Sequence, residues 1–183
     1  MLAVSRRLTQ GASGFCGGQS EPGDHAIGRS RGGPTTKIHL ACDGHGRPLS
    51  VVLTGGNVND CTMFTQVMAS IEFRRPGPGR SPTRPSRVLA DKGYSSRAIR
   101  SYLRRRHIPA TIPERRDQQA NRLRRGRAGG RPPAFDRVAY RRRNIVERCF
   151  NRFKQFRAIA TRFDKTAISY RGMIDLATLL IWL

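Results

Sequence analysis

The sequence contains few acidic residues and little lysine. Against 35 Lys and Arg residues it has only 12 Asp and Glu, which gives its 183 residues a formal charge of +23. Four of the basic residues are lysines, so arginine supplies almost all of the excess. The planar guanidinium of arginine pairs with phosphate oxygens in a bidentate way that lysine cannot. A GC-rich coding bias can add to the arginine content, but this net charge favours a nucleic-acid partner.

The usual signatures of metal-binding, disulfide-rich and membrane proteins are also missing. The histidines form no H-E-x-x-H pattern, and no C-x-x-C pair occurs. The cysteines are Cys16, Cys42, Cys61 and Cys149. No segment has the profile of a signal peptide, and the apolar stretch from Met173 to Leu183 is too short to span a bilayer. The sequence therefore predicts a cytoplasmic protein with no membrane partner, and it argues against a zinc site.

The chain divides into two parts. Residues 1–33 are rich in Gly, Ser, Gln and Arg, which predicts a disordered or irregular segment. Residues 34–183 form the predicted domain. It begins with two strand-like runs, Thr35–Cys42 and Pro48–Thr54, on either side of a Gly-rich turn, and this arrangement is typical of a β-hairpin.

The rest of the pattern predicts the order β-β-α-β-α-β-α, a mixed α/β sheet. Asp60 is expected to be the N-cap of the first helix, and Ser95-Ser96 to cap the second. An arginine-rich loop, expected to be mobile, interrupts the pattern at about 114–134. The other expected elements are strands at 87–91 and 108–112, and helices at 61–71, 96–105, 136–157 and 170–183.

Two carboxylates stand out by their positions. Asp91 ends an apolar strand, where α/β sheets place their chemistry. Glu147 lies in the middle of a predicted helix, near the border of its apolar face. Each also has an ordinary explanation: Asp91 as a helix cap, and Glu147 as the partner of Arg143 or Asn151 in an i,i+4 pair. Spacing alone leaves both possibilities open.

The predicted helix carries a specific motif. Its residues Tyr140, Arg143, Glu147 and Lys154 resemble, in type and spacing, the signature of the insertion-sequence DDE transposases, bacterial enzymes with a ribonuclease-H-like catalytic domain. The segment Leu89–Tyr94 is similar to the second-aspartate motif of that family. The resemblance extends over roughly residues 24 to 183. It includes the segments 28–33, 36–40 and 56–60.

The resemblance implies a two-metal phosphoryl transfer on DNA. Asp91 would be the second catalytic aspartate and Glu147 the catalytic glutamate, and together they would hold magnesium or manganese through oxygen ligands. Tyr140, Arg143 and Lys154 would lie on one face of the same helix and contact DNA phosphates. The partners would be transposon ends and target DNA, and the family suggests a homo-oligomer.

The arginine-rich loop is a second candidate DNA contact. Arg122, Arg124 and Arg125 would each neutralise a phosphate, so that binding would weaken steeply with salt. The alternative is a disordered polar insertion without a defined contact. The two interpretations are compatible, because a mobile basic loop can become ordered on DNA.

The sequence departs from the family at its first aspartate. Family members carry this residue on the first strand, which is central in the sheet, whereas the first 23 residues of this chain contain no aspartate. Asp43 and Asp60 are better explained by a turn and a helix cap. We therefore expect a ribonuclease-H-like mixed sheet flanked by helices whose first, central strand is missing, in a truncated and inactive transposase. The alternatives are a non-catalytic basic nucleic-acid-binding remnant, and a nuclease of the same fold that does not join DNA ends.

Overall fold

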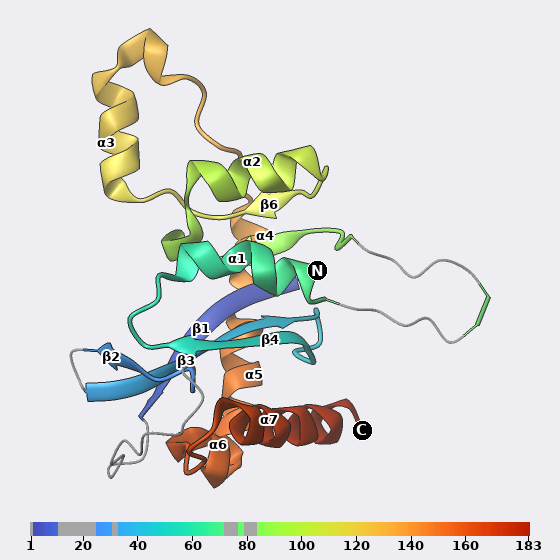
Figure 1. The fold of residues 1–183 in the computed structure, drawn as a ribbon. Helices are drawn as coiled ribbons and strands as arrows, with labels where there is room; N and C mark the ends of the chain where they lie inside the picture. Colours follow the sequence, from blue (N-terminus) through green and yellow to red (C-terminus); the bar gives the residue numbers. More distant parts are fainter. Residues whose placement is uncertain (1, 11–24, 31–32, 72–76, 79–83) are drawn as a thin grey trace.

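The structure, a computed structural model, describes residues 2–10, 25–30, 33–71, 77–78 and 84–183. Its centre is a six-stranded sheet (Figure 1). Five strands follow the order β2-β3-β1-β5-β6, and β4 pairs with residues 36–42 of β3, beyond the residues that pair with β2. Strand β1 is antiparallel to β3 and parallel to β5, so the predicted mixed sheet is confirmed. The strands are β1 Leu2–Gln10, β2 Gly28–Ser30, β3 Gly33–Cys42, β4 Pro48–Gly55, β5 Val88–Ala90 and β6 Ala110–Thr111.

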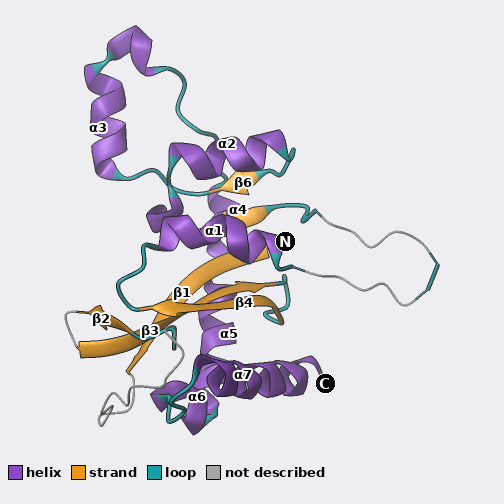
Figure 2. Cartoon of the chain, viewed as in Figure 1, coloured by secondary structure: helices purple, strands orange, loops and turns teal. Residues whose placement is uncertain are grey.

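Helices lie on both faces of this sheet (Figure 2). No helix in the described part of the chain has the length and hydropathy needed to cross a membrane. The α-helices are α1 Asp60–Ala69, α2 Arg97–Arg105, α3 Arg116–Arg124, α4 Arg137–Arg141, α5 Asn144–Gln155, α6 Arg157–Thr161 and α7 Ala167–Trp182. Two 3₁₀ turns, η1 Lys92–Tyr94 and η2 Gly126–Gly129, complete the set.

The prediction of a missing central strand is wrong. Strand β1 lies between β3 and β5, and its residues from Ala3 to Gln10 pair with β3. The prediction of an irregular 1–33 segment is therefore wrong for β1 and β2, while residues 11–24 and 31–32 lie outside the described residues. The sequence LAVSRRLTQ alternates poorly between apolar and polar residues. Its strand conformation comes from pairing on both sides, because β-propensity depends strongly on such tertiary context.

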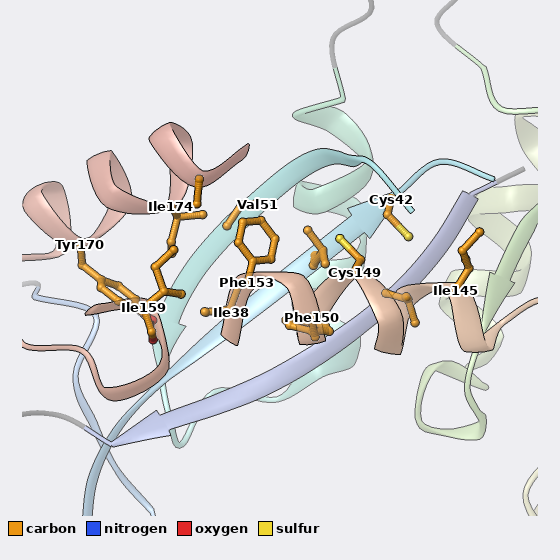
Figure 3. Packing of buried hydrophobic residues seen from close by; sticks show 13 residues of the cluster. Ile38, Cys42, Val51, Ile145, Cys149, Phe150, Phe153, Ile159, Tyr170 and Ile174 are labelled. Carbon is orange, nitrogen blue, oxygen red and sulfur yellow. The ribbon is translucent and has the colours of Figure 1, made fainter. Parts of the chain in front are cut away.

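Two apolar clusters hold the helices to the sheet. On one face α1 and α2 pack against β5, with Phe64 and Leu103 fully or almost fully buried. On the other face α5, α6 and α7 pack against alternate residues of β3 (Figure 3). The residues labelled there include Ile38, Cys42, Val51, Ile145, Cys149, Phe150, Phe153, Ile159, Tyr170 and Ile174. These clusters fix the position of α5, which carries Glu147, and of β5, which Asp91 follows directly.

Several local predictions are confirmed. The β3–β4 hairpin, strands β5 and β6, and helix α2 with Ser96 as its N-cap all form as expected. The N-cap of α1 was predicted wrongly: Asn59, not Asp60, accepts a hydrogen bond from the Cys61 amide at 3.0 Å. Asp60 forms an ion pair with Lys37 at 3.2 Å instead.

The predicted helix over 136–157 is divided into α4 and α5. Residues Arg142 and Arg143 form a turn between them, in which the amides of Arg142, Arg143, Ile145 and Val146 each bond the carbonyl three residues earlier. Such i→i−3 bonds tighten the chain relative to an α-helix. Tyr140 and Glu147 therefore do not share one regular helix, contrary to the prediction. The predicted loop at about 114–134 also contains regular structure, namely α3 and η2.

Candidate nuclease site

Asp91 lies immediately after β5 and caps the turn that follows. Its Oδ1 accepts a hydrogen bond from the Gly93 amide at 2.6 Å. A Cβ added at Gly93 would lie only 2.8 Å from this oxygen, so a larger residue there would displace the Asp91 carboxylate from its capping position. The capping role considered for Asp91 is therefore present, and it leaves the second carboxylate oxygen for another partner.

The strand beside Asp91 supplies no carboxylate. Strands β1 and β5 run parallel, with Val4 paired to Ala90. In the chain, Ser5 follows Val4 and Asp91 follows Ala90. None of the nine residues of β1 is an Asp or Glu. The residue that follows the last position of β1 paired with β5 is therefore a serine.

Glu147 lies in the first turn of α5, and Arg143 connects it to Tyr140. The guanidinium of Arg143 is 3.9 Å from Glu147 Oε1 and 5.6 Å from the centre of the Tyr140 ring. The Glu147 side chain is 38% exposed. Lys154 is exposed near the end of α5. The structure thus brings three of the four motif residues into contact, even though the helix is broken between the first and the second.

Asp91 also lines a hollow of about 970 Å³. One wall is the turn 91–93, and the other consists of residues 114–117 and Gln119 at the start of α3. Glu147 does not belong to either wall. Within the described ranges, no group of three His, Cys, Asp or Glu side chains is arranged to hold a metal ion. Asp91 and Glu147, which the family resemblance assigns to a magnesium or manganese site, belong to no such group among these residues, and we derive no step through a metal.

The thiol of Cys61 reaches the same turn. Its Sγ donates a hydrogen bond to the Gly93 carbonyl at 2.8 Å. Burial raises the pKa of this thiol, and the nearby carboxylates of Asp60 and Asp91 act in the same direction, whereas Arg115 opposes them. Cys61 is therefore a neutral hydrogen-bond donor that ties the start of α1 to the Asp91 turn.

The three arginines predicted to contact DNA all belong to α3 or its C-terminal cap. Arg122 forms an ion pair with Glu114, and Arg124 donates a hydrogen bond to Asn121 at 3.0 Å. Arg125 is exposed at the cap. The guanidinium of Arg122 thus stabilises the segment itself, while the other two side chains face solvent.

Sequence reasoning missed the residue that attaches α3 to the site. The Gln118 amide accepts a hydrogen bond from Ser95 Oγ at 2.7 Å and donates one to the Ser95 carbonyl at 2.6 Å. Gln118 lies among polar and basic residues without a motif. Because its partner is 23 residues away, no local pattern could have identified it.

Comparison with known proteins identifies the family. The model of the family described as "Transposase DDE domain" matches residues 14–182. The chain therefore belongs to the DDE transposase family, whose domain has a ribonuclease-H-like fold. The matched region starts after β1. A transposase assigned to insertion sequence element IS402 of Burkholderia cepacia is 31% identical over 164 residues, which cover 90% of this chain and 69% of the relative. A transposase assigned to insertion sequence element IS6501 of Brucella ovis is 28% identical over 149 residues, which cover 81% of this chain and 98% of the relative. No solved structure matches.

Proposed function

We propose that this chain binds DNA as an insertion-sequence transposase but does not cut it. Asp91 and Glu147 are the proposed second and third carboxylates of the family site. The observation that carries the proposal is the acid-free strand β1, in which Ser5 follows the last residue paired with β5, just as Asp91 follows the last paired residue of β5. Two-metal phosphoryl transfer depends on carboxylates that hold both ions in a fixed geometry. With one ligand position occupied by serine, the set of ligands is incomplete.

The proposed DNA contacts lie on two parts of the chain. Arg143, stacked near Tyr140, and the exposed Lys154 belong to the motif helix. Arg124 and Arg125 belong to α3 and its cap. Arginine is suited to phosphate because its fork of donors matches two oxygens at once. We propose transposon ends and target DNA as partners, bound by a homo-oligomer as the family suggests.

The proposal predicts that the purified chain does not nick supercoiled plasmid in the presence of Mg²⁺ or Mn²⁺. Gel electrophoresis of plasmid after incubation with and without EDTA measures this directly. Asp91→Asn serves as the control, because any nicking that survives it comes from a contaminating nuclease. Nicking that requires the metal and disappears in Asp91→Asn would show that the site is complete, and would refute the proposed lack of cleavage.

The proposed DNA binding predicts a strong dependence on ionic strength. A protein that contacts six or more phosphates loses about 10³-fold in affinity between 50 and 200 mM salt, because bound counterions are released from the DNA. Fluorescence anisotropy with a labelled duplex at several salt concentrations gives the slope. A flat dependence, or no binding at 50 mM salt, would contradict binding through the arginine-rich surface.

A further inference from the structure

We infer that the hollow between the Asp91 turn and the start of α3 is a binding site for a single phosphodiester group of a DNA strand. Lys92, Arg115 and Arg116 line it and are the groups that would bind the phosphate. The inference rests on the proposed DNA binding and deepens it, because it assigns a local subsite beside Asp91. These three residues are distinct from the motif residues on α4 and α5.

The first observation is that α3 is fixed relative to the Asp91 turn. Gln118 holds Ser95 by two hydrogen bonds, and Ser95 is completely buried. Arg100 donates hydrogen bonds to Ser95 Oγ at 3.0 Å and to the Ile112 carbonyl at 2.9 Å. Ser95 therefore joins the start of α3 to the Asp91 turn, since its amide also donates a hydrogen bond to the Lys92 carbonyl. Arg100 connects this serine to the end of β6. Gln118 is a positioning residue for the wall that carries Arg115 and Arg116.

The second observation is that the same wall has internal supports. Arg115 donates a hydrogen bond from Nε to the Lys92 carbonyl at 3.4 Å, and this bond connects the two walls of the hollow. Glu114 is paired with Arg122. These contacts place the Arg115 side chain and the backbone of the wall before any ligand binds. A binding site whose groups are already ordered loses less conformational entropy when the ligand arrives.

The third observation concerns the charges that remain available. Lys92 and Arg116 are exposed, and in the part of the chain that the structure describes neither one takes part in an ion pair. The acidic residues of the walls are Asp91, Glu114 and Asp117, and only Glu114 is neutralised by an arginine from outside the hollow.

This balance of charge selects the ligand. Three cations attract an anion, while the carboxylates of Asp91 and Asp117 repel a second negative charge. A phosphodiester carries one charge, whereas free inorganic phosphate near pH 7 carries between one and two, as phosphate monoesters do. A volume of about 970 Å³ is at the upper end of ordinary small-ligand sites and has room for a nucleotide unit. The hollow therefore suits a phosphate within a DNA strand better than free phosphate.

Anisotropy with a labelled DNA oligonucleotide and the full chain tests the inference. The double variant Lys92→Ala/Arg116→Ala is expected to bind about 10-fold more weakly and to lower the salt slope by about one, because a single phosphate is no longer neutralised. The matched control is Arg104→Ala/Arg105→Ala, which removes the same charge from exposed positions at the end of α2. The control is expected to change affinity by less than about 2-fold.

A second pair of variants tests the positioning role without changing charge. Gln118→Ala is expected to weaken binding several-fold and to reduce the salt slope, because the arginine wall loses its attachment to Ser95. Gln66→Ala, at an exposed glutamine on α1 outside the hollow, should leave both unchanged. Circular dichroism and thermal melting check that each variant is folded. A Gln118→Ala variant that melts normally and retains the full salt slope would refute this role.

The outcomes separate the inference from the DNA-binding proposal. If the wild-type chain binds no DNA, both fail. If it binds, but Lys92→Ala/Arg116→Ala weakens binding no more than the α2 control, the subsite fails and the proposed function stands. Inorganic phosphate should compete only as much as sodium chloride of equal ionic strength. Stronger competition would assign the hollow to free phosphate and overturn the selection for a phosphodiester.

Discussion

Replacing Arg162 with alanine is expected to lower the free energy of unfolding by about 3 kcal/mol, because each buried acceptor left without a donor costs about 1–3 kcal/mol. Arg162 is completely buried. Its guanidinium donates hydrogen bonds to the carbonyls of His25 at 2.6 Å and Ala26 at 3.2 Å, and to Thr36 Oγ1. It thereby joins the segment before β2, strand β3 and the turn after α6.

The other surroundings of Arg162 are backbone carbonyls, the Tyr170 ring and the nearby carboxylate of Asp164. Its Nε donates to the Asp164 carbonyl at 3.3 Å, and its guanidinium lies 5.0 Å from the centre of the Tyr170 ring. Burial lowers the pKa of Arg162, but arginine remains charged at any ordinary pH. Lysine has a single ammonium and cannot reach the same set of acceptors. Arg162→Lys is therefore expected to recover only a small part of the loss.

Urea denaturation followed by circular dichroism measures this effect. Arg152→Ala is the matched control, because Arg152 is exposed on α5, and it should change stability by less than about 0.5 kcal/mol. A loss below about 1 kcal/mol for Arg162→Ala would mean that water replaces the guanidinium without cost. In that case the buried network would contribute little to holding β3 against α6 and α7.

Elements with strong local signals were predicted well from the sequence. The β3–β4 hairpin has apolar runs on either side of a Gly-rich turn, and Asp43 accepts hydrogen bonds there from the amides of His45 and Arg47. Burial alone would raise the pKa of Asp43, but its bonds to Arg47 and His45 outweigh this effect and lower it. Helix α2 begins after Ser96, whose side chain caps it. In these cases the deciding contacts lie within a few residues along the chain.

Elements that depend on distant contacts were predicted poorly. Strand β1 has a weak pattern of its own and is fixed by pairing with β3 and β5. Helix α3 has no buried residue, and its attachment runs through the hydrogen bonds between Gln118 and Ser95. Asp60 looked like a helix cap, yet it pairs with Lys37 on β3. Each error has the same cause, since a local pattern cannot reveal a partner that lies far away in the sequence.

The candidate site was partly predictable. The motif predicted that Tyr140, Arg143 and Glu147 share one helix face, and in the structure Arg143 lies near both of the others. The spacing could not reveal the turn that separates α4 from α5. The hollow beside Asp91 was not predictable, because its second wall belongs to a segment that looked like an unstructured loop. The catalytic roles of Asp91 and Glu147 remain predictions.

Replacing Ser5 with aspartate is expected to give the chain a metal response that the wild type lacks. Ser5 and Asp91 each follow directly after the last paired residues of β1 and β5, Val4 and Ala90, so we expect the new carboxylate to lie close to the existing one. Two adjacent negative charges repel each other without a cation, which should lower the melting temperature. Mg²⁺ should reverse this loss, because a ligand that binds only the folded state at 100 times its Kd stabilises that state by about 2.7 kcal/mol.

Melting curves with and without Mg²⁺, together with the plasmid assay, provide the two readouts. Ser5→Asp is expected to be stabilised by the ion and to nick plasmid only in its presence. Ser5→Asn, which has nearly the same shape and no charge, should do neither, and Ser5→Asp/Asp91→Asn should lose both. If a folded Ser5→Asp variant ignores Mg²⁺ in both assays, the serine on β1 is not what makes the ligand set incomplete. The incompatibility would then lie in the placement of Glu147 on α5, since the pairing of Val4 with Ala90 fixes the backbone immediately before both Ser5 and Asp91.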